Sequence, residues 1–131
     1  MLQSYLLKRM VKNKFSCEIY PKRKLIIFGT GKVGRRIYDI FANHINKGDI
    51  ICFWDNNILK NGTVLCDHLV EQPNLDRQDC LILIASSDYE KDMMRQLDEM
   101  GLEKNKNYIG WQDGVKKEVG IYLKHVYKCN A

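Results

Sequence analysis

The sequence lacks most of the features that mark exported, membrane-spanning or disulfide-rich proteins. Its 131 residues contain only 2 prolines, and no Cys-x-x-Cys pair occurs among the cysteines at 17, 52, 66, 80 and 129. No segment approaches the roughly 18 consecutive apolar residues that suggest a transmembrane helix, and the basic N-terminus has no apolar signal-peptide core. An odd number of widely spaced cysteines is typical of reduced thiols. We therefore expect a cytoplasmic protein with no membrane span.

A strong charge of one sign and a recognisable catalytic motif are also missing. The formal net charge is +5, and the Lys and Arg residues are mixed with acids, which fits a solvated surface or a bound polyanion such as a nucleotide. No nucleic-acid-binding signature accompanies that charge, so we expect no nucleic-acid partner. The sequence has no Gly-x-Ser-x-Gly elbow and no P-loop lysine, and its three histidines lack metal-ligand spacing. Catalytic residues therefore stay unknown, and no metal site is expected.

Short apolar runs predict an α/β fold. Residues 24–28, 50–54 and 80–85 are largely continuous apolar segments, as parallel strands covered on both faces require. Between the first two, apolar residues recur at three- and four-residue steps from Val33 to Ile45, which indicates one face of a helix. The sequence therefore predicts a single Rossmann-like domain with a parallel sheet and flanking helices.

Weaker patterns predict the remaining elements. A second helix is expected from Tyr89 to about Met100, ended by Gly101. A minor edge strand is expected at 63–65, a helical turn near 67–71, and a last strand at 107–109.

Three segments are expected along the chain. They are an N-terminal amphipathic helix and lead-in at 1–20, a Rossmann-like nucleotide-binding domain at 21–111, and a C-terminal helical tail at 112–131. The length suits one core and is short for a cofactor domain joined to a substrate domain. Apolar residues near both ends favour a homodimer or association with another protein.

The segment from Gly29 to Gly34, with the sequence Gly-Thr-Gly-Lys-Val-Gly, is the main candidate for a binding site. It lies between the first predicted strand and the first predicted helix, where a Gly-x-Gly-x-x-Gly motif holds a pyrophosphate. Gly29 permits the tight turn, Gly31 lets the backbone approach the phosphates, and Gly34 allows the helix to pack closely on the strand. Thr30, Lys32 and Val33 complete the predicted phosphate-binding loop.

Asp55 and Asn56 follow the second predicted strand, about 20 residues after the last glycine of the loop. An acid at this position can accept the ribose hydroxyls of an adenosine, which favours NAD over NADP. Lys32 and the basic pair Arg35 and Arg36 complicate that preference, because they could meet an additional phosphate. Asp55 is also consistent with a simple turn residue, and the basic residues with a solvated helix face.

Ala85, Ser86 and Ser87 follow the third long apolar run, at the strand end where ligands bind in open α/β sheets. The serine hydroxyls suit a ribose, a phosphate or a sugar, and they suit capping of the next helix equally well. Tyr89 is interpreted as a surface residue in preference to a catalytic acid.

Several of these strings resemble a known module. Residues 25–31, 53–57 and 81–86, together with Gly62 and Pro73, are similar to a Rossmann-like module of bacterial cell-surface sugar metabolism. Such modules occur in sugar O- and N-acyltransferases and in capsular-polysaccharide dehydratases and epimerases, and others are attached to glycosyltransferases and sugar methyltransferases. The resemblance covers roughly Lys24 to Leu102, and no acyltransferase, methyltransferase or membrane segment accompanies it here.

The resemblance implies a nucleotide-binding module of polysaccharide biosynthesis. In the acyltransferases the module resembles a holder for a nucleotide-sugar, and in other settings it is taken to bind NAD(P). We therefore expect NAD(H), or else NADP(H), as the ligand, with a UDP-sugar as the alternative. A minimal oxidoreductase or sugar-nucleotide enzyme completed by dimerisation is a further hypothesis, so the sequence leaves open whether the chain is an enzyme.

Overall fold

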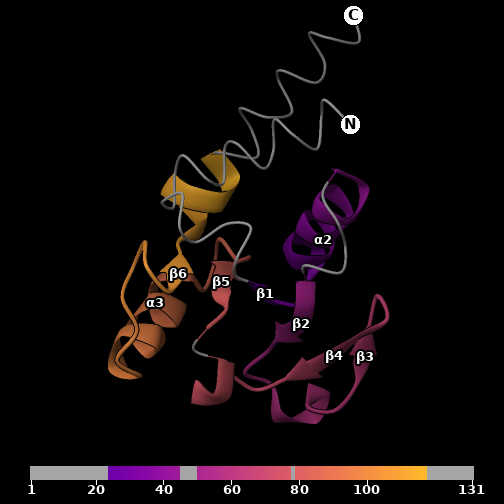
Figure 1. Cartoon of the computed structure of the whole chain (residues 1–131), viewed down its shortest axis with the longest axis horizontal. Helices are drawn as coiled ribbons and strands as arrows, with labels where there is room; N and C mark the ends of the chain where they lie inside the picture. The colour runs from indigo at the N-terminus through magenta and orange to yellow at the C-terminus, as the bar shows by residue number, and fades with distance from the viewer. Residues whose placement is uncertain (1–23, 45–49, 78, 118–131) are drawn as a thin grey trace, which may run out of the picture.

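The computed structural model describes residues 24–44, 50–77 and 79–117 (Figure 1). The predicted N-terminal helix and most of the predicted C-terminal tail lie outside these residues. The longer elements are β1 (Leu25–Phe28), α2 (Lys32–His44), β2 (Ile50–Trp54), β3 (Val64–Leu65), β4 (His68–Glu71), β5 (Leu81–Ile84), α3 (Glu90–Glu99) and β6 (Tyr108–Ile109). Short helical turns form at η2 (Ile58–Lys60), η3 (Leu75–Arg77) and η4 (Trp111–Val115).

The six strands form one sheet in the order β3-β4-β2-β1-β5-β6. Every neighbouring pair is parallel except β3 and β4, which run antiparallel. The chain therefore builds the sheet outward from β1 on one side and then returns to β5 on the other side of β1. The predicted α/β class with a parallel sheet is confirmed at this level.

Alternate residues of β1 face opposite sides of the sheet, and each side has its own core. Leu25 and Ile27 pack in a cluster with Ile37 of α2, whereas Ile26 and Phe28 pack in a second cluster with Leu97 of α3. All four residues of β1 have no exposed surface. This burial explains the continuous apolar run in the sequence, because a strand covered by helices on both faces has no side for polar residues.

The expected helical turn near residues 67–71 is wrong, because this segment is strand β4. Cys66 and Asp67 both have positive φ angles, 52° and 65°, and they form a two-residue turn between β3 and β4. A turn with both central residues in the left-handed region matches the twist of a hairpin. β4 then pairs with β2 through Phe53 and Val70, so the sheet gains both the hairpin and a parallel strand.

The cysteines among the described residues, Cys52, Cys66 and Cys80, form no disulfide. Cys52 and Cys80 are buried and Cys66 is partly buried. Burial raises the pKa of the Cys52 thiol, and a hydrogen bond with Glu71 raises it further. These three residues fit the expectation of reduced thiols, and Cys17 and Cys129 lie outside the described residues.

Two glycines let β1, α2 and β5 approach one another closely. A Cβ atom added to Gly34 would lie 1.9 Å from the carbonyl oxygen of Gly29. A Cβ atom added to Gly29 would lie 2.6 Å from the carbonyl oxygen of Ala85, and the φ angle of Gly29 is +134°. By contrast, a Cβ atom at Gly31 would meet nothing within 4 Å. The first and last glycines of the loop are therefore required by the packing of backbone on backbone, whereas Gly31 is not.

Replacing Gly34 by alanine should destabilise the fold strongly, because neither Gly29 nor α2 can move away without disturbing the sheet. We expect a loss of about 3 kcal/mol or more, at the upper end of overpacking costs, and a fall in Tm of roughly 10 °C or more by thermal unfolding. The matched control is Gly31→Ala, which should change stability by less than about 1 kcal/mol. Equal Tm values for the two variants would contradict this account of the loop.

Candidate functional site

A cavity of about 630 Å³ opens where β1, β2 and β5 end. It lies at the point where the strand order reverses direction, since β1 has β2 on one side and β5 on the other, and this is where open α/β sheets bind their ligands. Every predicted site residue lines the cavity except Gly34, which is buried beneath the loop. The lining residues are Gly29, Thr30, Gly31, Lys32, Val33, Asp55, Asn56, Lys60, Ala85, Ser86, Ser87, Asp88, Tyr89, Asp92 and Met93.

One wall of the cavity is the glycine loop and the start of α2. The loop is held to the sheet by a hydrogen bond of 2.9 Å from the Gly29 N–H to the Trp54 carbonyl oxygen. The first helical bond of α2 runs from the Arg35 N–H to the Gly31 carbonyl oxygen at 3.0 Å, so the N–H groups before Arg35 have no carbonyl one turn earlier in the helix. The first turn contains no acidic residue. The positive end of the helix dipole therefore faces the cavity without a neighbouring carboxylate from that turn.

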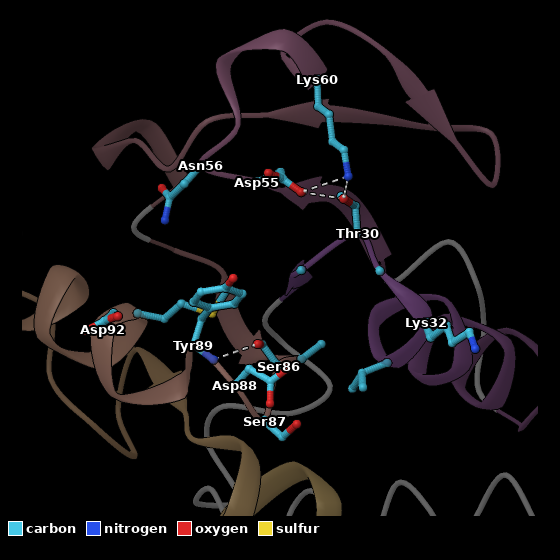
Figure 2. Close-up of a pocket in the computed structure, with 15 residues that line it drawn as sticks. Thr30, Lys32, Asp55, Asn56, Lys60, Ser86, Ser87, Asp88, Tyr89 and Asp92 are labelled. Atoms are coloured by element: carbon cyan, nitrogen blue, oxygen red, sulfur yellow. Dashed lines mark hydrogen bonds and ion pairs between the residues drawn. The ribbon is translucent and has the colours of Figure 1, made fainter.

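Asp55 occupies the end of β2 within a small polar cluster, which Figure 2 shows beside the loop. One of its oxygens, Oδ1, accepts a hydrogen bond of 2.7 Å from the Asn57 N–H. Its other oxygen, Oδ2, accepts a hydrogen bond from the Thr30 hydroxyl and lies 3.6 Å from Lys60 Nζ. Lys60 Nζ also donates a hydrogen bond of 2.9 Å to Thr30 Oγ1. The cluster joins the glycine loop to the segment after β2.

The opposite wall begins at the end of β5 and continues into α3. The Ala85 N–H donates to the Phe28 carbonyl oxygen at 2.9 Å, which extends the pairing of β5 with β1 to the cavity edge. Ser86 Oγ accepts a hydrogen bond of 3.1 Å from the Tyr89 N–H, which stabilises the turn that leads into α3. Tyr89 is 65% exposed. Ser86 therefore closes the turn before α3 and does not cap the helix itself, whose N-cap residue, Tyr89, has no side-chain cap hydrogen bond. Tyr89 has the expected surface position, and both residues line the cavity.

The side chain of Asn56 is bound to α3 instead of standing free. Its amide nitrogen donates to Gln96 Oε1 at 2.8 Å, and Gln96 Nε2 donates in return to Asn56 Oδ1 at 2.9 Å. This reciprocal amide pair connects the end of β2 to α3 across 40 residues of sequence. It fixes the separation between two walls of the cavity, and any ligand contact to Asn56 must share these amide groups.

Lys60, Asp88, Asp92 and Met93 line the cavity but were not among the predicted site residues. Asp92 and Met93 lie three and four residues after Tyr89, on the first turn of α3, so helical spacing could have indicated them. Lys60 reaches the cavity because Asn57 caps the short helix η2, its Oδ1 accepting a hydrogen bond of 3.0 Å from the Leu59 N–H.

Arg35 and Arg36 are exposed and do not line the cavity, which agrees with their interpretation as a solvated helix face.

Among the described residues, no group of three or more His, Cys, Asp or Glu side chains is placed to hold a metal ion. Nor does that part of the chain contain a helix with the length and apolar character needed to cross a bilayer.

The amide pair between Asn56 and Gln96 should be measurable as a coupling in stability. We expect the free-energy cost of Asn56→Ala plus that of Gln96→Ala to exceed the cost of the double variant by about 0.5–1 kcal/mol in denaturant unfolding, the range for a partly exposed hydrogen-bonded pair. The control combines Asn56→Ala with Gln112→Ala, whose side chain is exposed elsewhere, and should be additive. Additivity of Asn56→Ala with Gln96→Ala would show that the pair does not form in solution.

Comparison with known proteins identifies the family. No curated protein matches the chain. The model of the family described as C2185-like, N-terminal, matches residues 21–108, which include β1 to β5, α2, α3 and the first residue of β6. The match spans more than half of the chain and contains every residue that lines the cavity. The chain therefore belongs to the C2185-like, N-terminal family.

Proposed function

We propose that this chain is a Rossmann-type domain that binds a nucleotide through its phosphates. The parallel strands, numbered by their order in the chain, occupy the sheet positions 3-2-1-4-5, which is the order of the dinucleotide-binding fold without its sixth strand. The glycine loop follows the first of these strands and opens the first helix, as that fold requires. This agreement of order and loop supports the proposal.

The observation that carries the proposal is the geometry at Gly31. The backbone of Gly31 is exposed, and the space where a side chain would stand is empty. Gly31 directly precedes α2, and its carbonyl oxygen accepts the first helical bond, from Arg35. The N–H groups at the start of α2 have no partner within the helix. An anion placed there would meet several N–H donors, the helix dipole and the Lys32 side chain. A pyrophosphate is the nucleotide group that fits this position.

The rest of the cavity supports a ligand with two different ends. The wall formed by Asp55 and Lys60 suits the ribose of the first nucleoside, and the wall formed by Ser86, Ser87 and Asp88 offers hydrogen-bonding groups to a second ring. Asp88 and Asp92 on that wall disfavour another anionic group. NAD(H) and NADP(H) meet these conditions.

A nucleotide-sugar is the second candidate. The hydroxyls of Ser86 and Ser87 and the carboxylate of Asp88 suit the hydroxyl groups of a sugar equally well. The resemblance to modules of polysaccharide biosynthesis supports both candidates. On this proposal the domain would work within, or beside, an enzyme that modifies a sugar.

Nucleotide binding is tested first with the wild-type chain. Thermal unfolding is followed with NADH, NADPH and UDP-glucose, because a ligand at 100 times its Kd adds about 2.7 kcal/mol to stability. Stabilisation by NADH or NADPH supports the dinucleotide proposal. Stabilisation by UDP-glucose alone supports the nucleotide-sugar candidate, and no stabilisation by any of the three contradicts nucleotide binding.

Replacing Gly31 by leucine should abolish this binding while leaving the fold intact, because the new side chain would occupy the space for the phosphates. We expect at least a tenfold loss of affinity by isothermal titration, about 1.4 kcal/mol, with a Tm close to that of the wild type. Arg36→Leu is the matched control, since it places the same side chain on α2 away from the cavity. Unchanged affinity in Gly31→Leu would refute phosphate binding at the loop.

A further inference from the structure

Lys60 changes the chemistry expected at the end of β2. Its ammonium group contacts both Thr30 Oγ1, at 2.9 Å, and Asp55 Oδ2, at 3.6 Å. Figure 2 shows the three side chains gathered together, with Lys32 apart from them on the first turn of α2. Lys60 and Lys32 therefore serve different parts of any bound ligand.

The carboxylate of Asp55 is already occupied by partners within the chain. Oδ1 accepts from the Asn57 N–H, and Oδ2 accepts from the Thr30 hydroxyl and faces Lys60. Only 18% of the Asp55 side chain is exposed. A ribose with two free hydroxyls needs a carboxylate that can accept both of them. Oδ1 keeps one acceptor site beside Asn57, but at Oδ2 a second ribose hydroxyl would have to displace Thr30 or Lys60.

The positive charge of Lys60 remains accessible to a ligand. Its side chain is 47% exposed and lines the cavity. An ammonium group has three N–H donors, of which one is directed to Thr30 and a second faces Asp55. The third can bind a phosphate oxygen. Because Lys60 also neutralises Asp55, a phosphate group beside them would not meet an unpaired carboxylate.

We infer that Lys60 is a specificity-determining residue that selects a nucleotide carrying a phosphomonoester on its ribose. Of the two dinucleotides proposed above, this favours NADP(H), through its 2′-phosphate, over NAD(H). It reverses the preference that Asp55 suggested from sequence, since that preference assumed an acid free to accept the diol. The inference rests on the proposed function, because it concerns the ribose end of the same site.

The inference predicts a measurable preference in the wild-type chain and its loss in one variant. Titration calorimetry should show NADPH binding at least tenfold more tightly than NADH, and 2′,5′-ADP more tightly than 5′-AMP, from which it differs only by the 2′-phosphate. In Lys60→Met the NADPH affinity should fall at least tenfold more than the NADH affinity, so that the preference for NADPH is lost. Lys60→Arg should retain the preference, because it keeps the charge.

Lys32→Met is the matched control. It removes the same charge from the same cavity at the pyrophosphate end, so it should weaken NADPH and NADH by a similar factor and leave their ratio unchanged. Tm values of all variants, measured without ligand, separate a loss of folding from a loss of contact.

The possible failures are distinguishable. A wild-type chain that binds NADH as tightly as NADPH overturns the inference and leaves the proposed function standing. The same holds if Lys60→Met keeps the wild-type ratio of affinities. Absence of binding to both dinucleotides and to both adenosine phosphates overturns the inference together with the dinucleotide proposal.

Discussion

The contact between the backbones of Gly29 and Gly34 is the constraint on which the site depends. Because neither residue has a side chain, α2 can begin almost directly above the end of β1. Gly29 at the same time lies against the Ala85 carbonyl at the end of β5. The start of one helix and the ends of two strands therefore meet at one place. This convergence aims the N–H groups of α2 into the space left between β1, β2 and β5.

The parts of the fold that could be predicted are those that depend on local sequence. The continuous apolar runs of β1, β2 and β5 follow from burial on both faces, and the glycine loop follows from steric limits on a turn between strand and helix. The hairpin of β3 and β4 could not be predicted in this way. Its turn residues, Cys66 and Asp67, adopt positive φ angles without the usual Asn-Gly pair, and only pairing with β2 explains why the next residues are a strand.

The candidate site, too, could be predicted from the sequence only in part. The residues directly after each strand, such as Thr30, Asp55 and Ser86, could be located because carboxyl ends of parallel strands share one edge of the sheet. The partners of these residues could not. Lys60 reaches Thr30 across 30 residues and Gln96 reaches Asn56 across 40, and both contacts depend on how η2 and α3 are placed. The sequence therefore indicates which side chains surround the cavity more readily than which of them are free to bind.

The three glycines of the loop carry different kinds of information. Gly29 and Gly34 are fixed by atoms of the protein itself, whereas the space beside Gly31 is empty in the chain alone. Relatives that keep the fold would thus be expected to retain the outer two glycines whatever they bind. If the proposed phosphate ligand were lost in a relative, the packing of the protein would no longer require glycine at the middle position. The residue type at this one position would then distinguish relatives that keep the proposed phosphate site from relatives that have lost it.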